Sequence, residues 1–327
     1  MITINNKKKH LKEDIELLLK LWNTSGVGVR TLDKFIFKLR ETGKKLFEVQ
    51  YLDRKKLRDL GLSARSVKDF KTGSSNEKSI AENLFRNHVD VHLKDDLAYP
   101  HYLSNFVDNP PPVLFTRNNV ELLSKPTVGF CGSRDVSEQG IEIAHQCSSI
   151  LVEAGFNVIS GHARGVDKAA HATALSEGGT TTIVPAEGIL KFSPDQNMKE
   201  IISPNNHLII SSFFPTARWT AYRAMERNSL ICGLSDAMIL VESGKEGGTF
   251  EAGKTTLEMG KPLFVIDYGN PPDSAVGNEF FLKYGGKSLR RAKNGEPNVE
   301  EVIKVAKEFF EGRERKENLK VENMKLF

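Results

Sequence analysis

The sequence has little cysteine, with three such residues in 327: Cys131, Cys147 and Cys232. Each lies singly in an apolar stretch, and no two stand in the C-x-x-C spacing of metal or redox sites. We therefore expect reduced core residues rather than metal ligands or nucleophiles. Neither a metal nor a cofactor is expected from this composition.

The sequence also lacks long hydrophobic runs. No apolar segment approaches the ~18–20 residues that span a bilayer, and the basic start, MITINNKKKH, has no apolar segment of a signal peptide behind it. These features exclude a membrane partner and favour a cytoplasmic protein. The length nevertheless allows a large core and predicts two domains, because single cores stop growing near about 250–300 residues.

The sequence also has little excess of one sign of charge over the other. Lys and Arg number 46 against 42 Asp and Glu, a net charge of +4. This balance is only a weak sign of an anionic partner. A case for nucleic-acid binding therefore has to rest on local sites.

Residues 1–72 predict a small helical domain with two glycine-centred turns, NTSGVGVRTLDKF and LRDLGLSARSVKDF. Such turns present backbone amides at a helix N-terminus to phosphate in helix-hairpin-helix modules. A helical bundle whose turns simply need glycine explains them equally. The polar stretch Lys71–Ser79 is the expected linker.

Residues 79–290 alternate apolar runs with helical stretches. Strands are predicted at Thr127–Cys131, Val158–Ser160, Thr181–Val184, Leu208–Ser211, Ala237–Val241 and Leu263–Ile266. This alternation predicts an α/β domain with a doubly wound, mostly parallel sheet, whose ligands bind at the carboxyl ends of the strands. Residues 291–327 predict an amphipathic helix with a charged tail.

Two of the strand-end turns carry arginine between small residues. Gly132, Ser133 and Arg134 follow the first strand, and Gly161, Arg164 and Gly165 follow the second. Glycine lets a backbone approach closely, and arginine offers a fork of donors to a phosphate. In the same segments Asp167 is open to a helix-capping role, His171 to a packing role, and Arg134 to pairing with Asp135 or Glu138.

Two further turns complete the predicted groove. Arg227 and Asn228 precede the strand at Ala237, and a glycine-rich turn follows that strand. Its candidate residues are Lys245, Gly247, Gly248 and Thr249. Four polar turns on one sheet edge would form a single anion-binding groove.

These blocks together resemble the DNA-processing protein A family (DprA/Smf). The resemblance covers residues 99–266 and is most specific in the GSR turn, ISGHARGVDKAAHATAL and ERNSLICGLSDAMILVE. It implies an extended Rossmann-like fold, an N-terminal SAM-like or hairpin domain, and single-stranded DNA held in a basic groove. It also implies homodimers, loading of the recombinase RecA, and no catalysis.

The chain departs from the family pattern in three places. Ser229 stands where the family has a second arginine, and Glu246 to Thr249 replaces a basic Ser-Gly-Ser turn. A helix follows Ile266 where a winged helix is usual. The sequence thus resembles a divergent member, and each lost phosphate contact lowers affinity and its dependence on salt.

Two other functions use the same residues. Gly248–Thr255 matches the P-loop expression G-x-x-x-x-G-K-[ST], with Asp267 as a Walker B candidate, but Gly248 lies too far beyond its strand. EGGTFEA partly matches the signature of nucleotide-binding phosphoribohydrolases, with Glu251 one place from the expected carboxylate. Single-stranded DNA binding is the preferred hypothesis, with Arg134, Arg164, Arg227 and Lys245 as phosphate clamps.

Overall fold

The computed structural model describes residues 11–73, 76–292 and 295–325, with side chains up to residue 316. The basic start, part of the predicted linker and the end of the charged tail lie outside the described residues. Among the helices described, none combines the length and the apolar character that crossing a membrane requires.

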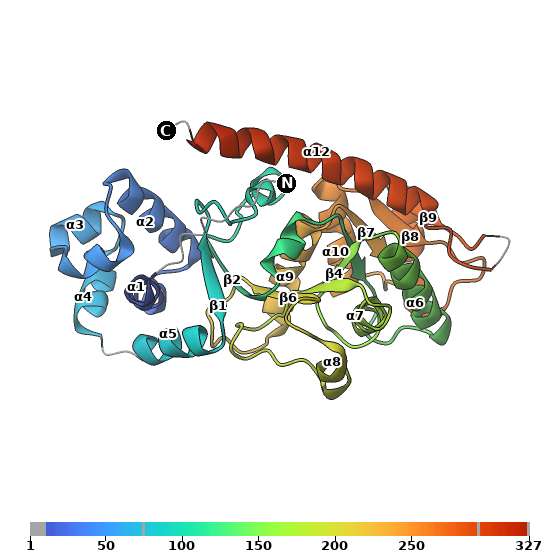
Figure 1. Ribbon diagram of the computed structural model, residues 1–327, viewed down its shortest axis with the longest axis horizontal. Coiled ribbons are helices and arrows are strands. Elements are labelled where there is room, and N and C mark those ends of the chain that lie inside the picture. Colours follow the sequence, from blue (N-terminus) through green and yellow to red (C-terminus); the bar gives the residue numbers. More distant parts are fainter. Residues whose placement is uncertain (1–10, 74–75, 293–294, 326–327) are drawn as a thin grey trace.

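The described strands form one sheet in the order β1-β2-β6-β5-β4-β3-β7-β8-β9 (Figure 1). Their bounds are β1 (Val89–Leu93), β2 (Val113–Asn118), β3 (Thr127–Cys131), β4 (Asn157–Ser160), β5 (Thr180–Ile183), β6 (His207–Ser211), β7 (Ala237–Leu240), β8 (Leu263–Ile266) and β9 (Lys287–Leu289). All neighbours from β6 to β9 pair in parallel, whereas β1 with β2 and β2 with β6 are antiparallel. The predicted α/β fold with a mostly parallel sheet is confirmed.

The helices and 3-10 helices lie between these strands or at the two ends of the chain. Their bounds are α1 (Lys12–Asn23), α2 (Val29–Glu41), η1 (Leu46–Tyr51), α3 (Arg54–Asp59), α4 (Ala64–Thr72), α5 (Glu77–Arg86), η2 (His101–Asn105), η3 (Val120–Ser124), α6 (Glu138–Glu153), α7 (Val166–Ser176), α8 (Gln196–Ile201), α9 (Ala221–Leu234), α10 (Gly248–Glu258), η4 (Asp273–Ala275), α11 (Asn278–Lys283) and α12 (Glu300–Lys325).

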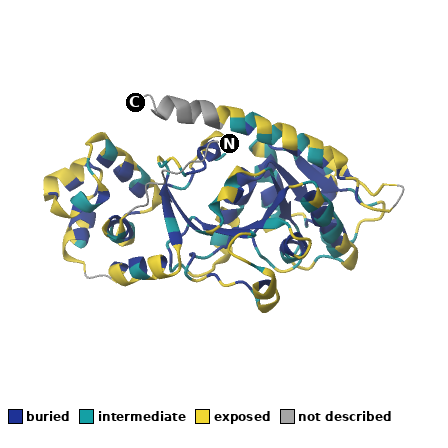
Figure 2. Ribbon diagram, viewed as in Figure 1, coloured by how far each residue is buried: buried dark blue, intermediate teal, exposed yellow. Residues whose placement is uncertain are grey.

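The sheet is covered on both faces. Side chains of α6, α7 and α12 share one buried cluster with the sheet, and those of α9, α10 and α11 share another. Figure 2 shows the consequence, with the strands buried and the outer sides of the helices exposed. Helices on both faces follow from right-handed crossovers that first run from β3 to β6 and then from β7 to β9.

Six strands lie where the sequence predicts them, and three were missed. β1 and β2 are antiparallel additions at one edge, and β2 begins directly after three consecutive prolines, Pro110 to Pro112. The prolines precede the ladder, so no hydrogen bond of the strand is lost. β9 has only three residues, too few to show a periodic pattern.

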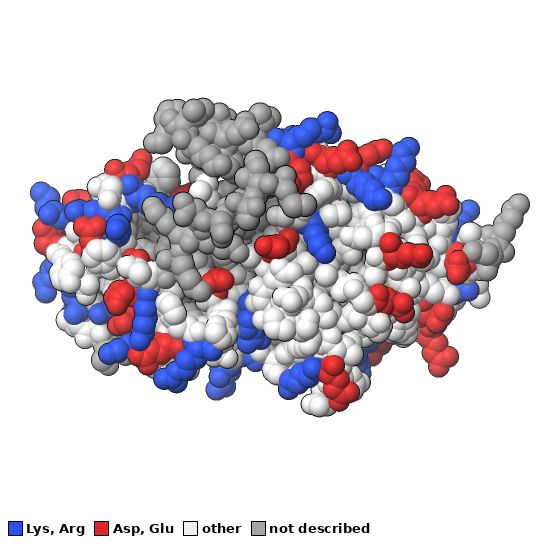
Figure 3. Space-filling model, in the orientation of Figure 1, with Lys and Arg blue, Asp and Glu red and all other residues white. Residues whose placement is uncertain are grey.

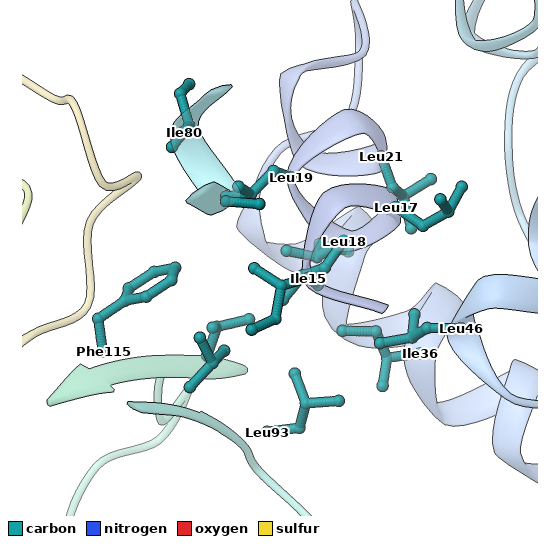
Figure 4. Close-up of a cluster of buried hydrophobic side chains, with 14 of the residues drawn as sticks. Ile15, Leu17, Leu18, Leu19, Leu21, Ile36, Leu46, Ile80, Leu93 and Phe115 are labelled. Carbon is teal, nitrogen blue, oxygen red and sulfur yellow. The ribbon is translucent and has the colours of Figure 1, made fainter. Parts of the chain in front are cut away.

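The N-terminal helices share their core with the edge of the sheet. Figure 4 shows Ile15 and Leu18 of α1 between the other helices and the strands, with Ile80 of α5 and Phe115 of β2 nearby. Trp22 stacks on Phe115 at 6.2 Å between ring centroids. The all-helical lobe is thus present, but its core continues into the sheet, so a boundary between residues 72 and 79 stays a proposal.

Helix α12 is the last element of the described chain. It packs as an amphipathic helix, since its Val302 and Ala306, together with Val299 just before it, are buried in the cluster that includes the sheet. Farther along, Arg313 reaches Asp236, which precedes β7, at 3.2 Å, and both side chains are fully buried. This ion pair links the C-terminal helix to the amino ends of the strands, opposite the carboxyl ends where the predicted turns lie.

Candidate functional site

The strand-end turns meet where the strand order reverses, between β3 and β7. After β3 the chain continues to β4 on one side, and after β7 it continues to β8 on the other. The Ser133 amide donates to the Glu242 carbonyl oxygen at 2.8 Å, which joins the turns that follow these two strands. Doubly wound sheets bind ligands at this position because the two loops diverge there and leave a crevice.

A cavity of about 490 Å³ lies at this point, on the side of α9 and α10. Its size falls in the range of small-ligand sites. Seven predicted residues line it: Gly132, Ser133, Arg134, Arg227, Asn228, Gly248 and Thr249. Five others do not: Gly161, Arg164, Gly165, Lys245 and Gly247. The structure therefore brings three of the four predicted turns to one cavity and places the second mainly behind it.

Arg134 is the exposed cation of this cavity. Its guanidinium carbon lies 5.6 Å from the ring centre of Trp219, a cation–π arrangement that directs the group over the opening. The alternative partner Asp135 instead pairs with Arg164, whose side chain is 72% exposed. Arg134 thus lines the cavity beside Trp219, whereas one arm of Arg164 is engaged by the carboxylate of Asp135.

Arg227 differs from the expected surface clamp. It is only 6% exposed, and its Nη1 donates to the Val184 carbonyl oxygen. Burial lowers the pKa of Arg227, and the nearby carboxylate of Asp167 opposes that shift. The sequence interpretation is corrected accordingly: Arg227 is a buried cation in the wall of the cavity, and direct contact with phosphate stays a prediction.

Asp167 holds the second turn from inside. Its Oδ2 accepts from the amides of Gly161 and Ala163 at 3.1 and 3.2 Å. Burial raises the pKa of this carboxyl, while Arg227 lowers it. Asp167 therefore does not cap the helix, as considered from the sequence, but holds the amides of the turn that precedes it. His171 is fully buried, with Nδ1 2.6 Å from Thr181 Oγ1, so its packing role is confirmed.

The glycines of the first two turns make room for protein rather than for ligand. A Cβ on Gly161 would lie 1.5 Å from Arg227 Nη1, and one on Gly132 would lie 2.3 Å from a Val166 methyl. Gly165 has φ +86°, and a Cβ there would lie 2.4 Å from the Ser133 carbonyl oxygen. The expectation that Gly132, Gly161 and Gly165 admit a ligand backbone is corrected for this reason.

This correction predicts a structural effect of Gly165→Ala. The free energy of unfolding should fall by about 2–5 kcal/mol, because left-handed backbone strain adds to the clash with the 133–134 turn. Gly155 is the control, since its φ is +85° and the space around it is open. Gly155→Ala should cost only the strain, about 1–2 kcal/mol. Equal losses in urea unfolding of the two variants would show that no close packing exists at Gly165.

The turn after β7 is open to a ligand. Gly247 is the N-cap of α10 with φ +98°, no side chain caps this helix, and no protein atom would meet a Cβ on Gly247. Asn228 Nδ2 donates to the Gly248 carbonyl oxygen at 3.0 Å and fixes the first residue of the helix. The first-turn amides of α10 are therefore left without a side-chain cap beside the cavity that Arg134 lines, as in helix N-termini that bind anions, and the exposed carboxylate of Glu246 lines the same cavity.

An exposed aromatic surface beside the cavity was missed by the sequence interpretation. Trp219 is 51% exposed, Tyr222 75% and Met225 50%, and Trp219 and Met225 also line the cavity. They belong to the stretch RWTAYRAM, where large apolar residues stand among arginines just before and within the first turns of α9. Large apolar residues interleaved with arginines do not form the apolar stripe of a core helix. This pattern is a signal of an exposed apolar surface that the sequence offered.

The visible face in Figure 3 carries interspersed basic and acidic side chains at its rim and a broad uncharged area in the middle. The described surface in this view therefore offers scattered rather than continuous positive charge.

Comparisons with known proteins agree with this geometry. Residues 90–295 match the model of the family described as DNA recombination-mediator protein A. The chain is similar to DNA processing protein DprA of Streptococcus pneumoniae, at 33% identity over 56% of this chain and 64% of the relative. It is also similar to that of Bacillus subtilis, at 27% identity over 60% and 66%. These alignments thus span slightly less than two thirds of each relative.

Solved structures show the same fold. An X-ray structure of DprA from Streptococcus pneumoniae superposes with a TM-score of 0.70 at 24% identity, covering 86% of this chain and 95% of that one. A structure of DNA processing protein A from Helicobacter pylori, described for its single-stranded DNA binding mode, gives 0.53 at 23% identity and covers 61% and 90%. At these identities the likeness concerns the fold alone.

Proposed function

The chain belongs to the DNA recombination-mediator protein A family, and from this premise we propose that it binds single-stranded DNA without catalysing a reaction. The observation that carries the proposal is the pairing of Arg134 with Trp219 beside the open N-terminus of α10. One cavity thus combines donors for a phosphate with an aromatic face for a base. Single-strand binding proteins use the same combination.

The backbone of the strand is assigned to the polar side of the cavity. Arg134 and the first-turn amides of α10 supply charge-assisted and dipolar hydrogen bonds to phosphate oxygens. Ser133 and Asn228 line the same wall and add neutral donors. Such contacts read the sugar–phosphate chain and not the base edges, so binding is indifferent to sequence.

The bases are assigned to the exposed aromatic surface. Trp219 and Tyr222 present rings to solvent near the cavity, and Met225 adds a flexible apolar contact. Stacking of a base on such a ring contributes about 1–3 kcal/mol and tolerates every base. An aromatic surface next to the cavity favours a polymer over an isolated phosphate.

A hydrolytic enzyme of the phosphoribohydrolase kind fits less well. Its mechanism requires a free carboxylate at the reaction centre. Glu251 does not line the cavity and pairs with Lys254 at 3.5 Å, and Asp167 is held by two amides. The remaining carboxylate of the lining is Glu246, an exposed residue that lies before the glycine turn and outside the partial signature's carboxylate position. Glu251, which stands one place from the expected carboxylate in the sequence, thus also lies away from the cavity.

A P-loop ATPase is disfavoured by the position of its motif. Lys254 lies in the middle of α10, not at its start, and Gly253 packs against Phe281, where a Cβ would lie 2.6 Å from the ring. A P-loop lysine must extend from the first turn over a loop of free amides. The match at Gly248–Thr255 therefore reflects a packed helix.

The proposal predicts salt-dependent binding that increases with oligomer length. The fluorescence of Trp219 measures binding directly in a Trp22→Phe background. This background removes the other tryptophan, Trp22, which is stacked on Phe115 in the helical lobe. A twenty-nucleotide single strand should quench Trp219 fluorescence and bind far more tightly than a mononucleotide. Its affinity should fall steeply between 50 and 200 mM salt as counterions are displaced. Equal affinity for the mononucleotide, or no change with salt, contradicts strand binding.

We also propose that the chain forms a homodimer through α11. Val276, just before this helix, is 43% exposed, and Phe280 and Tyr284 are 40% and 59% exposed, which leaves a contiguous apolar patch with Phe250 beneath it. Burying such a patch against a second copy removes it from water. Phe280→Glu should shift sedimentation to the monomer, whereas Phe37→Glu, on the exposed side of α2, should not. A wild-type protein that sediments as a monomer at micromolar concentration refutes the dimer.

The family's description as a recombination mediator supports one further step, the loading of a RecA-type recombinase onto the bound strand. The strand would remain accessible for this transfer because the cavity is open on the side of Trp219 and Tyr222. Co-precipitation of the recombinase that depends on the oligonucleotide tests this step.

A further inference from the structure

A second cavity, of about 470 Å³, lies at the carboxyl ends of β8 and β9. It is bounded by α6, which packs on the face of the sheet opposite α9 and α10. It shares no lining residue with the first cavity. Its position at the same edge of the sheet makes it a separate ligand site of the kind that parallel strands provide.

The floor of the second cavity is apolar and is bordered by an aromatic ring. Ile143, Ile266 and Leu289 are each about 2–3% exposed, and Tyr268 is the second residue after β8. The Tyr268 hydroxyl donates to Glu242 Oε1 at 3.0 Å, which fixes the orientation of the ring. A fixed ring above aliphatic side chains is suited to a flat, weakly polar group such as a nucleobase.

The rim of the second cavity is cationic. Arg290 uses both Nε and Nη2 on Asp267 Oδ2, each at 2.7 Å, while its side chain remains 73% exposed. A guanidinium has five donors, so those that do not face Asp267 stay available in a fixed orientation. Arg291, the next residue, is exposed at the same rim. This arrangement fits a phosphate beside the base.

One residue connects the two cavities. The Glu242 carbonyl oxygen accepts from Ser133 in the first cavity, at 2.8 Å. The Glu242 carboxylate accepts from the Ser137 amide at 2.9 Å, at the start of α6, and from Tyr268 in the second cavity. Glu242 therefore holds the turn that presents Arg134 through its backbone and the ring that lines the second cavity through its side chain.

We propose that the second cavity binds one nucleotide unit of the strand held at the first, with the base against Tyr268 and the phosphate on Arg290 and Arg291. The proposal rests on the proposed function, since the strand must first occupy the Arg134 cavity. The chemistry itself is that of a nucleotide, and a free nucleotide could supply it too. The experiment separates these two sources.

The test compares fluorescein-labelled oligothymidylates of four and twenty nucleotides, and free thymidine monophosphate, on four proteins. The variants are Arg291→Ala, the double variant Arg290→Ala/Arg291→Ala, and Lys316→Ala. Lys316 is an exposed cation beyond Arg313 at the opposite edge of the sheet and serves as the control. Arg291→Ala leaves the Asp267 pair intact, so it remains informative if the double variant unfolds.

We expect the double variant to lose about tenfold in affinity for the long strand and less than about twofold for the short one. Lys316→Ala should change neither. A strand that carries 5-iodouracil should photocrosslink to Tyr268. If the long strand binds the double variant as it binds the control, or if Tyr268 is never crosslinked, the second site is refuted while strand binding at Arg134 stands.

Failure of the proposed function gives a different result. In that case neither oligomer binds the wild-type protein, and Arg134→Ala changes nothing. Binding of thymidine monophosphate that depends on Arg291 would then identify a free nucleotide as the occupant and overturn the assignment to a strand.

Discussion

Replacing Arg134 with alanine should lower affinity for single-stranded DNA by about one to two decades and leave the melting temperature almost unchanged. A charge-assisted hydrogen bond to phosphate is worth about 1.5–3 kcal/mol, and each 1.4 kcal/mol changes affinity about tenfold. The fold should tolerate the change because Arg134 is exposed and lies over the face of Trp219. Contacts of this kind add only about 0.5–1 kcal/mol at the surface.

Two variants sharpen this prediction. Arg134→Lys keeps the charge but not the planar fork, so it should recover only part of the loss. Arg164→Ala tests the neighbouring turn: this exposed arginine pairs with Asp135 and does not line the cavity, so its loss should lower affinity less than the loss of Arg134. Fluorescence anisotropy measures the affinity and calorimetry the melting temperature of these variants, of Arg134→Ala and of the wild-type protein. A lower melting temperature with unchanged affinity for Arg134→Ala would assign this residue to the fold.

The largest loss of stability is expected for Arg313→Met. The free energy of unfolding should fall by about 3–5 kcal/mol, because removing one partner leaves a buried charge unpaired. The Arg313 and Asp236 side chains are 1% and 0% exposed, and burial raises the pKa of Asp236 to about 6 although Arg313 opposes that shift. Arg313 also lies over the Tyr102 ring at 4.2 Å, so packing is lost with the charge.

The controls for this prediction lie on the same helix and in the same pair. Arg315→Met changes an exposed arginine two residues farther along α12 and should cost little. Asp236→Asn combined with Arg313→Met removes both charges and keeps an acceptor for the Thr127 amide, which donates to Asp236 Oδ2 at 2.9 Å. The double variant should recover part of the loss in urea unfolding. A loss for Arg313→Met no greater than for Arg315→Met would show that the pair contributes nothing.

The sequence by itself determined the parts of this protein that depend on local patterns. Alternating apolar runs located β3 to β8, because a strand buried on both faces needs consecutive apolar residues wherever it lies. Glycine beside arginine marked the turn at Arg134, since only local backbone chemistry is required to recognise it. The resemblance to the family depended on the same short segments and not on long-range contacts.

Tertiary structure alone decided which of the marked residues face a ligand. Arg164 and Arg227 look alike in the sequence, yet Arg164 is exposed and Arg227 is buried against Gly161, because Arg227 lies on the buried face of helix α9. The Arg313 pair and the Tyr268 link to Glu242 join segments far apart in the chain. Local periodicity carries no information about such distances, so the wall of the site and its neighbouring cavity emerged only when the sheet order was known.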